Sequence, residues 1–149
     1  MNPPAANSSL GHRLLQLGIL LFLLGLLTGF AVPMLANPRM GLSSHLEGIL
    51  NGIFLVLLGL VWPKLRLPRS WLTTAFWLAI YGTFANWGAT LLAAYWGAGA
   101  SMPLAADGFK GSPHQEAIIN FLLYSLSFAM VALCVIVLWG LTAGLRKAT

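Results

Sequence analysis

Charged residues are scarce in this chain. Only 7% of its 149 residues are Asp, Glu, Lys or Arg, whereas 58% are hydrophobic, and the mean hydropathy is +0.83. A soluble domain keeps about a quarter of its residues charged, so this chain could not cover a surface exposed to water. The sequence therefore predicts a single domain, residues 1–149, that lies in a lipid bilayer.

Cysteine is also rare. The single cysteine, Cys134, lies in an apolar run, which excludes an intrachain disulfide, a zinc site of several cysteines and a C-x-x-C-H attachment site for covalent haem. Three acidic residues against eight Lys and Arg give a net charge of +5. The basic residues lie at the ends of apolar runs rather than in one patch, so we expect no nucleic-acid partner and attribute them to membrane orientation.

Long apolar runs are what the chain has instead. A helix needs about 20 mostly apolar residues to cross the hydrocarbon core, and four segments meet this requirement. They are residues 14–35, 44–62, 71–96 and 117–145. The pattern predicts an all-α fold, an integral membrane four-helix bundle, with a loop over residues 97–113 before the last helix.

Positive charge is distributed unevenly between the two ends of the predicted spans. For four crossings, most Lys and Arg residues fall on one side, namely Arg13, Lys64, Arg66, Arg69, Arg146 and Lys147. Because loops rich in Lys and Arg face the cytoplasm, we expect both termini on the cytoplasmic side of a bacterial inner (cell) membrane. An interfacial aromatic belt is expected at the tryptophans near the span ends, which are Trp62, Trp71, Trp96 and Trp139.

Polar residues inside the spans are the functional candidates, because a polar group in hydrocarbon costs free energy unless it has a partner. In the second span, His45, Gly48 and Gly52 share one helix face. This stripe suits a flat macrocycle, whose metal the imidazole binds while the glycines let the ring approach. Two other interpretations stay open: G-x-x-x-G also packs helices, and a histidine near a helix end is often only hydrogen-bonded.

Further polar residues lie on the neighbouring faces. Glu47 and Asn51 line the adjacent face of the second span, and Gly82, Asn86 and Thr90 share a face of the third. Asn86 needs a partner, which is either another helix or a substrate. A stripe on the fourth span either lines a cavity or makes interhelical hydrogen bonds; it consists of Glu116, Asn120, Tyr124 and Ser127.

Other chemistries lack their residues. The chain has no Ser-His-Asp set, no glycine-rich phosphate loop and no paired carboxylates in the spans. A transmembrane electron carrier with bis-histidine haems needs facing pairs of buried histidines, and only His45 is placed to serve. One axial histidine leaves the opposite face of the metal open, which favours activation of a ligand over electron transfer.

The runs His45-Leu-Glu-Gly-Ile-Leu-Asn-Gly52 and Gly82-Thr-Phe-Ala-Asn-Trp-Gly88 resemble the hydroxylaminobenzene mutase family, which is related to membrane-bound styrene oxide isomerases. The resemblance covers nearly the whole chain. It implies an intramolecular isomerase (hydroxymutase) that converts arylhydroxylamines, its small aromatic substrates, to 2-aminophenols by a redox-neutral Lewis-acid rearrangement of the N–O bond. From the styrene oxide isomerases it implies ferric haem b, held by one histidine between the subunits of a homotrimer.

Position by position, the resemblance places the haem ligand on His45 and the two catalytic asparagines on Asn51 and Asn86. The epoxide branch has an aspartate and a tyrosine where this sequence has Gly82 and Thr90, which favours a hydroxylamine substrate. The alternatives are an epoxide isomerase, a haem or quinone electron-transfer subunit, and a transporter or structural subunit.

Overall fold

The computed structural model describes residues 4–145, and these residues form helices joined by short connections without any strand. The elements are α1 (Pro4–Ala31), η1 (Val32–Met34), α2 (Pro38–Val61), η2 (Trp62–Lys64), α3 (Arg69–Trp96), α4 (Pro103–Ala106) and α5 (Pro113–Leu145). The predicted all-α class is therefore confirmed for the described part of the chain.

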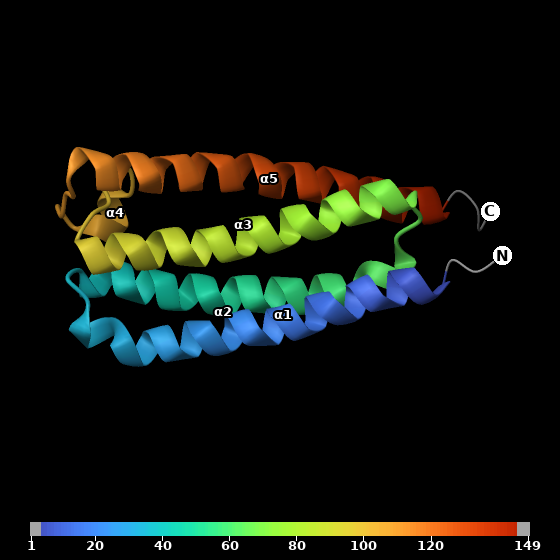
Figure 1. The fold of residues 1–149 in the computed structure, drawn as a ribbon, viewed down its shortest axis with the longest axis horizontal. Helices are drawn as coiled ribbons and strands as arrows, with labels where there is room; N and C mark the ends of the chain where they lie inside the picture. Colours follow the sequence, from blue (N-terminus) through green and yellow to red (C-terminus); the bar gives the residue numbers. More distant parts are fainter. Residues whose placement is uncertain (1–3, 146–149) are drawn as a thin grey trace.

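The long helices lie side by side, each antiparallel to the next, in the order α1, α2, α3 and α5 (Figure 1). α2 packs against both α1 and α3, α1 also contacts α3, and α5 packs against α3. Over residues 4–145, the α5 backbone approaches neither α1 nor α2. The structure thus differs from the predicted four-helix bundle in two respects: the row is open, and α4 is a fifth α-helix. α4 escaped prediction because four residues are too few to show a helical period.

The helices begin earlier than the predicted spans. α2 begins at Pro38 rather than at Ser44, because the Asn37 side-chain oxygen accepts a hydrogen bond from the backbone N–H of Met40 at 3.0 Å. An asparagine cap followed by proline is a strong start signal for a helix. α1, α3 and α5 likewise begin before residues 14, 71 and 117. Hydropathy locates the apolar part of each helix and misses its polar first turns.

Three segments are long and apolar enough to cross a membrane, judged by length and composition: Ser9–Met34, Pro38–Lys64 and Pro113–Ala143. Within the described residues, α3 is not one of them. The start of α1 and the end of α5 lie at the same end of the row (Figure 1).

Facing glycines form a seam of close contact between α1 and α2. A Cβ at Gly48 would lie 2.5 Å from the Cα of Gly25, and a Cβ at Gly52 would lie 2.6 Å from the backbone nitrogen of Phe22. Only glycine permits so close an approach of two helices. The glycine seam consists of Gly11, Gly18 and Gly25 on α1 and Gly48, Gly52 and Gly59 on α2.

Trp62 is fully buried, so the prediction that it belongs to an interfacial belt is wrong. A Cβ at Gly11 would lie 3.2 Å from the Trp62 Cβ, which shows that the small residue on α1 makes room for the indole. Trp71 and Trp139, by contrast, are 44% and 48% exposed. Their rings meet edge to face, with centroids 5.4 Å apart.

We expect Gly52→Ala to lower the thermal midpoint of the detergent-solubilised protein, because the added methyl would push α1 away from α2 at a cost of about 1–3 kcal/mol. Gly88→Ala on α3 is the matched control, since nothing lies within 4 Å of its Cβ position. Thermal unfolding followed by circular dichroism measures both variants. Equal midpoints for the two would show that the glycine seam does not hold the helices together.

Candidate functional site

Polar side chains from three helices are linked by hydrogen bonds at one level of the row. We call this set the polar layer. It consists of Thr28 on α1, Ser44, His45, Glu47 and Asn51 on α2, and Asn86, Trp87 and Thr90 on α3.

Glu47 is the centre of the polar layer on the side of α3. Its Oε2 accepts hydrogen bonds from the amide nitrogen of Asn51 at 3.0 Å and from that of Asn86 at 2.6 Å. Asn51 is buried, whereas Glu47 and Asn86 are half-buried. One carboxylate oxygen therefore joins α2 to α3 and brings together the two asparagines that the sequence analysis selected. We call these three residues the carboxylate–amide cluster.

His45 faces α1 instead. Its Nδ1 lies 2.8 Å from the carbonyl oxygen of Gly25, and a Cβ at Gly29 would lie 2.7 Å from the same nitrogen. Because a carbonyl oxygen only accepts hydrogen bonds, Nδ1 is the donor, and in the neutral imidazole the lone pair then lies on Nε2. Nε2 has no hydrogen-bond partner within residues 4–145. Metal-binding histidines commonly donate their other N–H to a backbone carbonyl in this way, so His45 fits the ligand role predicted for it.

Gly48 and Gly52 belong to the glycine seam, and α1 covers them. The structure thus gives them the packing role that the sequence analysis left open as an alternative to contact with a flat ring. Gly48 and Gly52 still affect His45, because they let α1 approach α2 so closely that the Gly25 carbonyl reaches the imidazole.

His45 and Glu47 lie on different sides of α2. Two residues along a helix correspond to a rotation of about 200°, which directs His45 toward α1 and Glu47 toward α3. The family resemblance implies one site that contains both the histidine and the asparagines. Within one chain they have different neighbouring helices.

The indole of Trp87 connects the two sides. Its Nε1 donates a hydrogen bond to the Thr28 hydroxyl at 3.1 Å, and that hydroxyl donates to the Leu24 carbonyl at 2.8 Å. The Ser44 hydroxyl donates to the Trp87 carbonyl at 3.2 Å. The contact between Thr28 and Trp87 could not be predicted from the sequence, because a contact between separate helices leaves no periodic signal.

The predicted stripe on α5 does not form one polar surface. The carboxylate of Glu116 accepts hydrogen bonds from the backbone N–H groups of Gly99, Ala100 and Gly111, so it organises the connection between α3 and α5. Asn120 Oδ1 is buried without a hydrogen-bond partner among the described residues. The other two members of the stripe are exposed, Tyr124 and Ser127.

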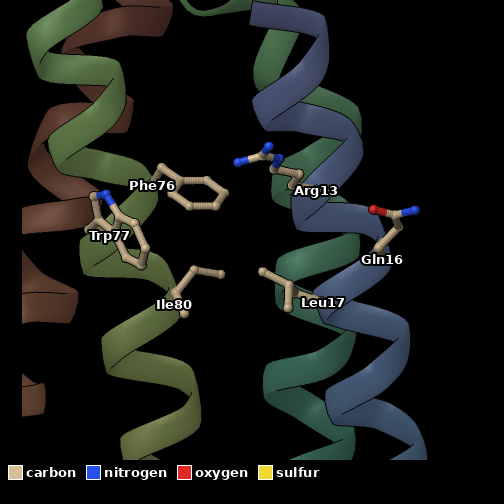
Figure 2. Close-up of a pocket in the computed structure, with 6 residues that line it drawn as sticks. All are labelled: Arg13, Gln16, Leu17, Phe76, Trp77 and Ile80. Atoms are coloured by element: carbon tan, nitrogen blue, oxygen red, sulfur yellow. The ribbon is translucent and has the colours of Figure 1, made fainter.

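A cavity of about 430 Å³ lies between α1 and α3, and Figure 2 shows the residues that line it. The Arg13 guanidinium points toward Phe76 across this cavity, whereas Gln16 points away from it (Figure 2). The full lining is Arg13, Gln16, Leu17, Phe76, Trp77 and Ile80. None of these residues belongs to the polar layer. At a rise of 1.5 Å per residue, Arg13 lies about 18 Å along α1 from Gly25, whose carbonyl contacts His45 in the polar layer.

The structure also contains a smaller and wholly apolar cavity of about 260 Å³. It lies between α2 and α5 and is lined by Phe54, Leu58, Leu133, Cys134, Val137 and Leu138. Phe54 follows Glu47 by two helical turns and shares its face of α2. The cluster and this cavity therefore lie on one side of α2, with Phe54 about 10 Å along the helix from Glu47 at 1.5 Å per residue.

The apolar helices and the internal polar layer define a helical protein of membrane type, and comparison with known proteins gives its family. The sequence profile described as styrene oxide isomerase matches residues 10–142. The chain is 58% identical over 151 positions to hydroxylaminobenzene mutase HabB of Ectopseudomonas oleovorans, with 100% of this chain and 92% of that protein covered. It is 51% identical over 125 positions to hydroxylaminobenzene mutase HabA of the same organism, covering 83% and 93%. No solved structure matches.

The chain therefore belongs to the styrene oxide isomerase family, and the resemblance seen in its sequence is confirmed. Both relatives carry the name of a mutase. The protein is accordingly an enzyme, an intramolecular isomerase.

We expect Thr28→Val to destabilise the protein by about 1–3 kcal/mol, because it leaves the Trp87 indole N–H without its acceptor. Thr83→Val is the matched control, since the Thr83 hydroxyl bonds only to carbonyls of its own helix, those of Ala79 and Ile80. Thermal midpoints in detergent compare the two. An equal loss in both variants would contradict a linking role for Thr28.

Proposed function

We propose that the protein converts arylhydroxylamines to 2-aminophenols by a redox-neutral rearrangement of the N–O bond. Its relatives HabB and HabA are named hydroxylaminobenzene mutases, which supports this substrate class. The structural observation that carries the proposal is the carboxylate–amide cluster, with an apolar cavity two helical turns further along the same face of α2. An arylhydroxylamine has the same two parts, a polar N–OH group on an apolar ring.

The packing of α3 supports the hydroxylamine over an epoxide. At Gly82, an added Cβ would lie 2.5 Å from the Met130 sulfur, so a longer acidic side chain would have to displace the methionine. The Thr90 hydroxyl donates to the carbonyls of Asn86 and Trp87 within its own helix. Neither position offers the acid or the phenol that the resemblance associates with epoxide opening.

We also propose that all four long helices cross the membrane, with both termini cytoplasmic in a bacterial inner membrane. α3 has 28 residues, a length of about 42 Å that exceeds a hydrocarbon core of about 30 Å. Its polar groups Asn86 and Thr90 are hydrogen-bonded within the polar layer, which lowers the cost of burying them in lipid. The basic residues Arg13, Lys64 and Arg69 then lie at the cytoplasmic ends.

His45 is the proposed ligand of haem b, through Nε2. The hydrogen bond from Nδ1 to the Gly25 carbonyl orients the ring and increases its basicity as a ligand. When bound, ferric haem would supply a Lewis acid for the substrate oxygen.

The polar side chains of the cluster orient the reacting group. In the net reaction, the hydroxyl group moves from nitrogen to the ortho carbon and a ring proton is replaced by one on nitrogen, so no electrons are gained or lost. Asn51 and Asn86 hydrogen-bond the N–OH group. The cavity beside Phe54 and Leu58 holds the ring and excludes water, which would otherwise add at other ring positions.

A homo-oligomer would explain how His45 and the carboxylate–amide cluster can serve one site although they lie on different sides of α2. Because His45 lies beside α1 and the cluster beside α3, we propose that the site is completed between copies of the chain. The open row leaves apolar side chains of α5 available for such contacts; Phe121 and Phe128 are 70% and 77% exposed. The number of copies in the proposal, three, comes from the family resemblance.

We expect purified wild-type protein to show the Soret absorption band of haem, and His45→Ala to abolish or strongly shift it. His114→Ala is the control, because His114 is exposed at the start of α5, and it should leave the band unchanged. A pure wild-type preparation that isomerises phenylhydroxylamine without haem or iron would refute the ligand assignment.

For the asparagines, Asn51→Ala and Asn86→Ala should each retain the Soret band but lose about 10²-fold in turnover of phenylhydroxylamine. Ser127→Ala is the control, since this exposed hydroxyl bonds only to a carbonyl of its own helix. Product formation is followed by liquid chromatography of 2-aminophenol. Wild-type rates in both asparagine variants would remove their assigned roles.

A further inference from the structure

Glu47 fixes which way the two catalytic amides point. A carboxylate oxygen accepts hydrogen bonds, so the nitrogen end of each amide must face Oε2. The observed distances, 3.0 Å from Asn51 and 2.6 Å from Asn86, show both nitrogens on this single oxygen. The carbonyl ends of both amides are therefore directed away from Glu47.

Three oxygens of the cluster remain as free acceptors. The Oδ1 atoms of Asn51 and Asn86 and the Oε1 atom of Glu47 accept no hydrogen bond from the part of the chain that the structure describes. None of them is among the fully buried unpaired polar atoms, which are Trp62 Nε1 and Asn120 Oδ1. Each of the three therefore keeps some accessible surface.

The neighbouring side-chain donors are already engaged. Ser44 donates to the Trp87 carbonyl, the Trp87 indole donates to Thr28, and Thr90 donates to carbonyls of its own helix. Each amide of the cluster keeps one further N–H, but three accepting oxygens outnumber these two donors. The cluster as a whole accepts hydrogen bonds rather than donating them.

We propose that this site selects ligands that donate hydrogen bonds, and that Glu47 is the positioning residue that sets this preference through Asn51 and Asn86. The inference rests on the proposed function and extends it to specificity. An arylhydroxylamine carries an N–H and an O–H, whereas an epoxide carries no donor. A ligand without donors would leave the three oxygens desolvated and unpaired, which strongly disfavours its binding.

Glu47→Gln tests the role of the carboxylate with little change of shape. A glutamine carbonyl oxygen can take the place of Oε2 and accept from both asparagines, since both bonds end on this one oxygen. The glutamine N–H₂ then takes the place of Oε1, which accepts no hydrogen bond from the described residues. The variant therefore exchanges one accepting oxygen for a donor. Glu47→Asp keeps a carboxylate and serves as the conservative variant.

The probes are benzyl alcohol and benzaldehyde, which share a skeleton but carry an O–H donor and a carbonyl acceptor respectively. Their binding to the purified full-length protein is measured by isothermal titration calorimetry. We expect the wild type to bind benzyl alcohol about tenfold or more tightly than benzaldehyde, equivalent to one properly made hydrogen bond. Glu47→Gln should abolish or reverse this preference, and Glu47→Asp and Ser127→Ala should keep it.

Equal binding of the two probes by the wild type would overturn the inference, and this comparison needs no variant to fold. An unchanged preference in Glu47→Gln would overturn the role of Glu47. Turnover of phenylhydroxylamine is measured on the same preparations. Turnover without a probe preference would refute the donor selection alone, whereas a preference without turnover would refute the proposed function and leave the donor selection standing.

Discussion

The close contact between the α1 and α2 backbones is the constraint on which the polar layer depends. Because no side chain separates Gly25 from Gly48, the Gly25 carbonyl comes within 2.8 Å of the His45 imidazole. The same approach lets Thr28 accept the indole N–H of Trp87 from α3. A wider spacing would leave the imidazole without the acceptor that determines its tautomer. Residues that pack the helices thus decide which nitrogen of the histidine is available for chemistry.

A carboxylate inside an apolar helix is costly unless it is well hydrogen-bonded. Glu47 meets this requirement with two amide donors, one from its own helix and one from α3. The arrangement stabilises the carboxylate and at the same time turns the amide oxygens outward. The two hydrogen bonds to Glu47 therefore have two effects. They stabilise the carboxylate, and they determine that the site offers amide oxygens to a ligand.

Much of the architecture could be predicted from the sequence, because long apolar runs report directly on helices. The start of α2 was placed too late, since hydropathy does not register the cap formed by Asn37. The neighbours Glu47 and Asn51 were visible from their spacing on one helix, whereas the bond from Asn86 depends on how two helices pack. Gly48 was ambiguous because one pattern serves both ring approach and helix packing, and only the position of Gly25 distinguishes them.

The central claim is that the substrate binds at the carboxylate–amide cluster and not in the larger cavity beside Arg13. A cryo-electron microscopy map of the purified protein with 2-aminophenol, the proposed product, tests this most directly. The account predicts density for the hydroxyl and amino groups of 2-aminophenol within hydrogen-bond distance of Glu47 and Asn86, with the ring of the product toward Phe54. Density for the product beside Arg13 and Trp77, with none at the cluster, would contradict it.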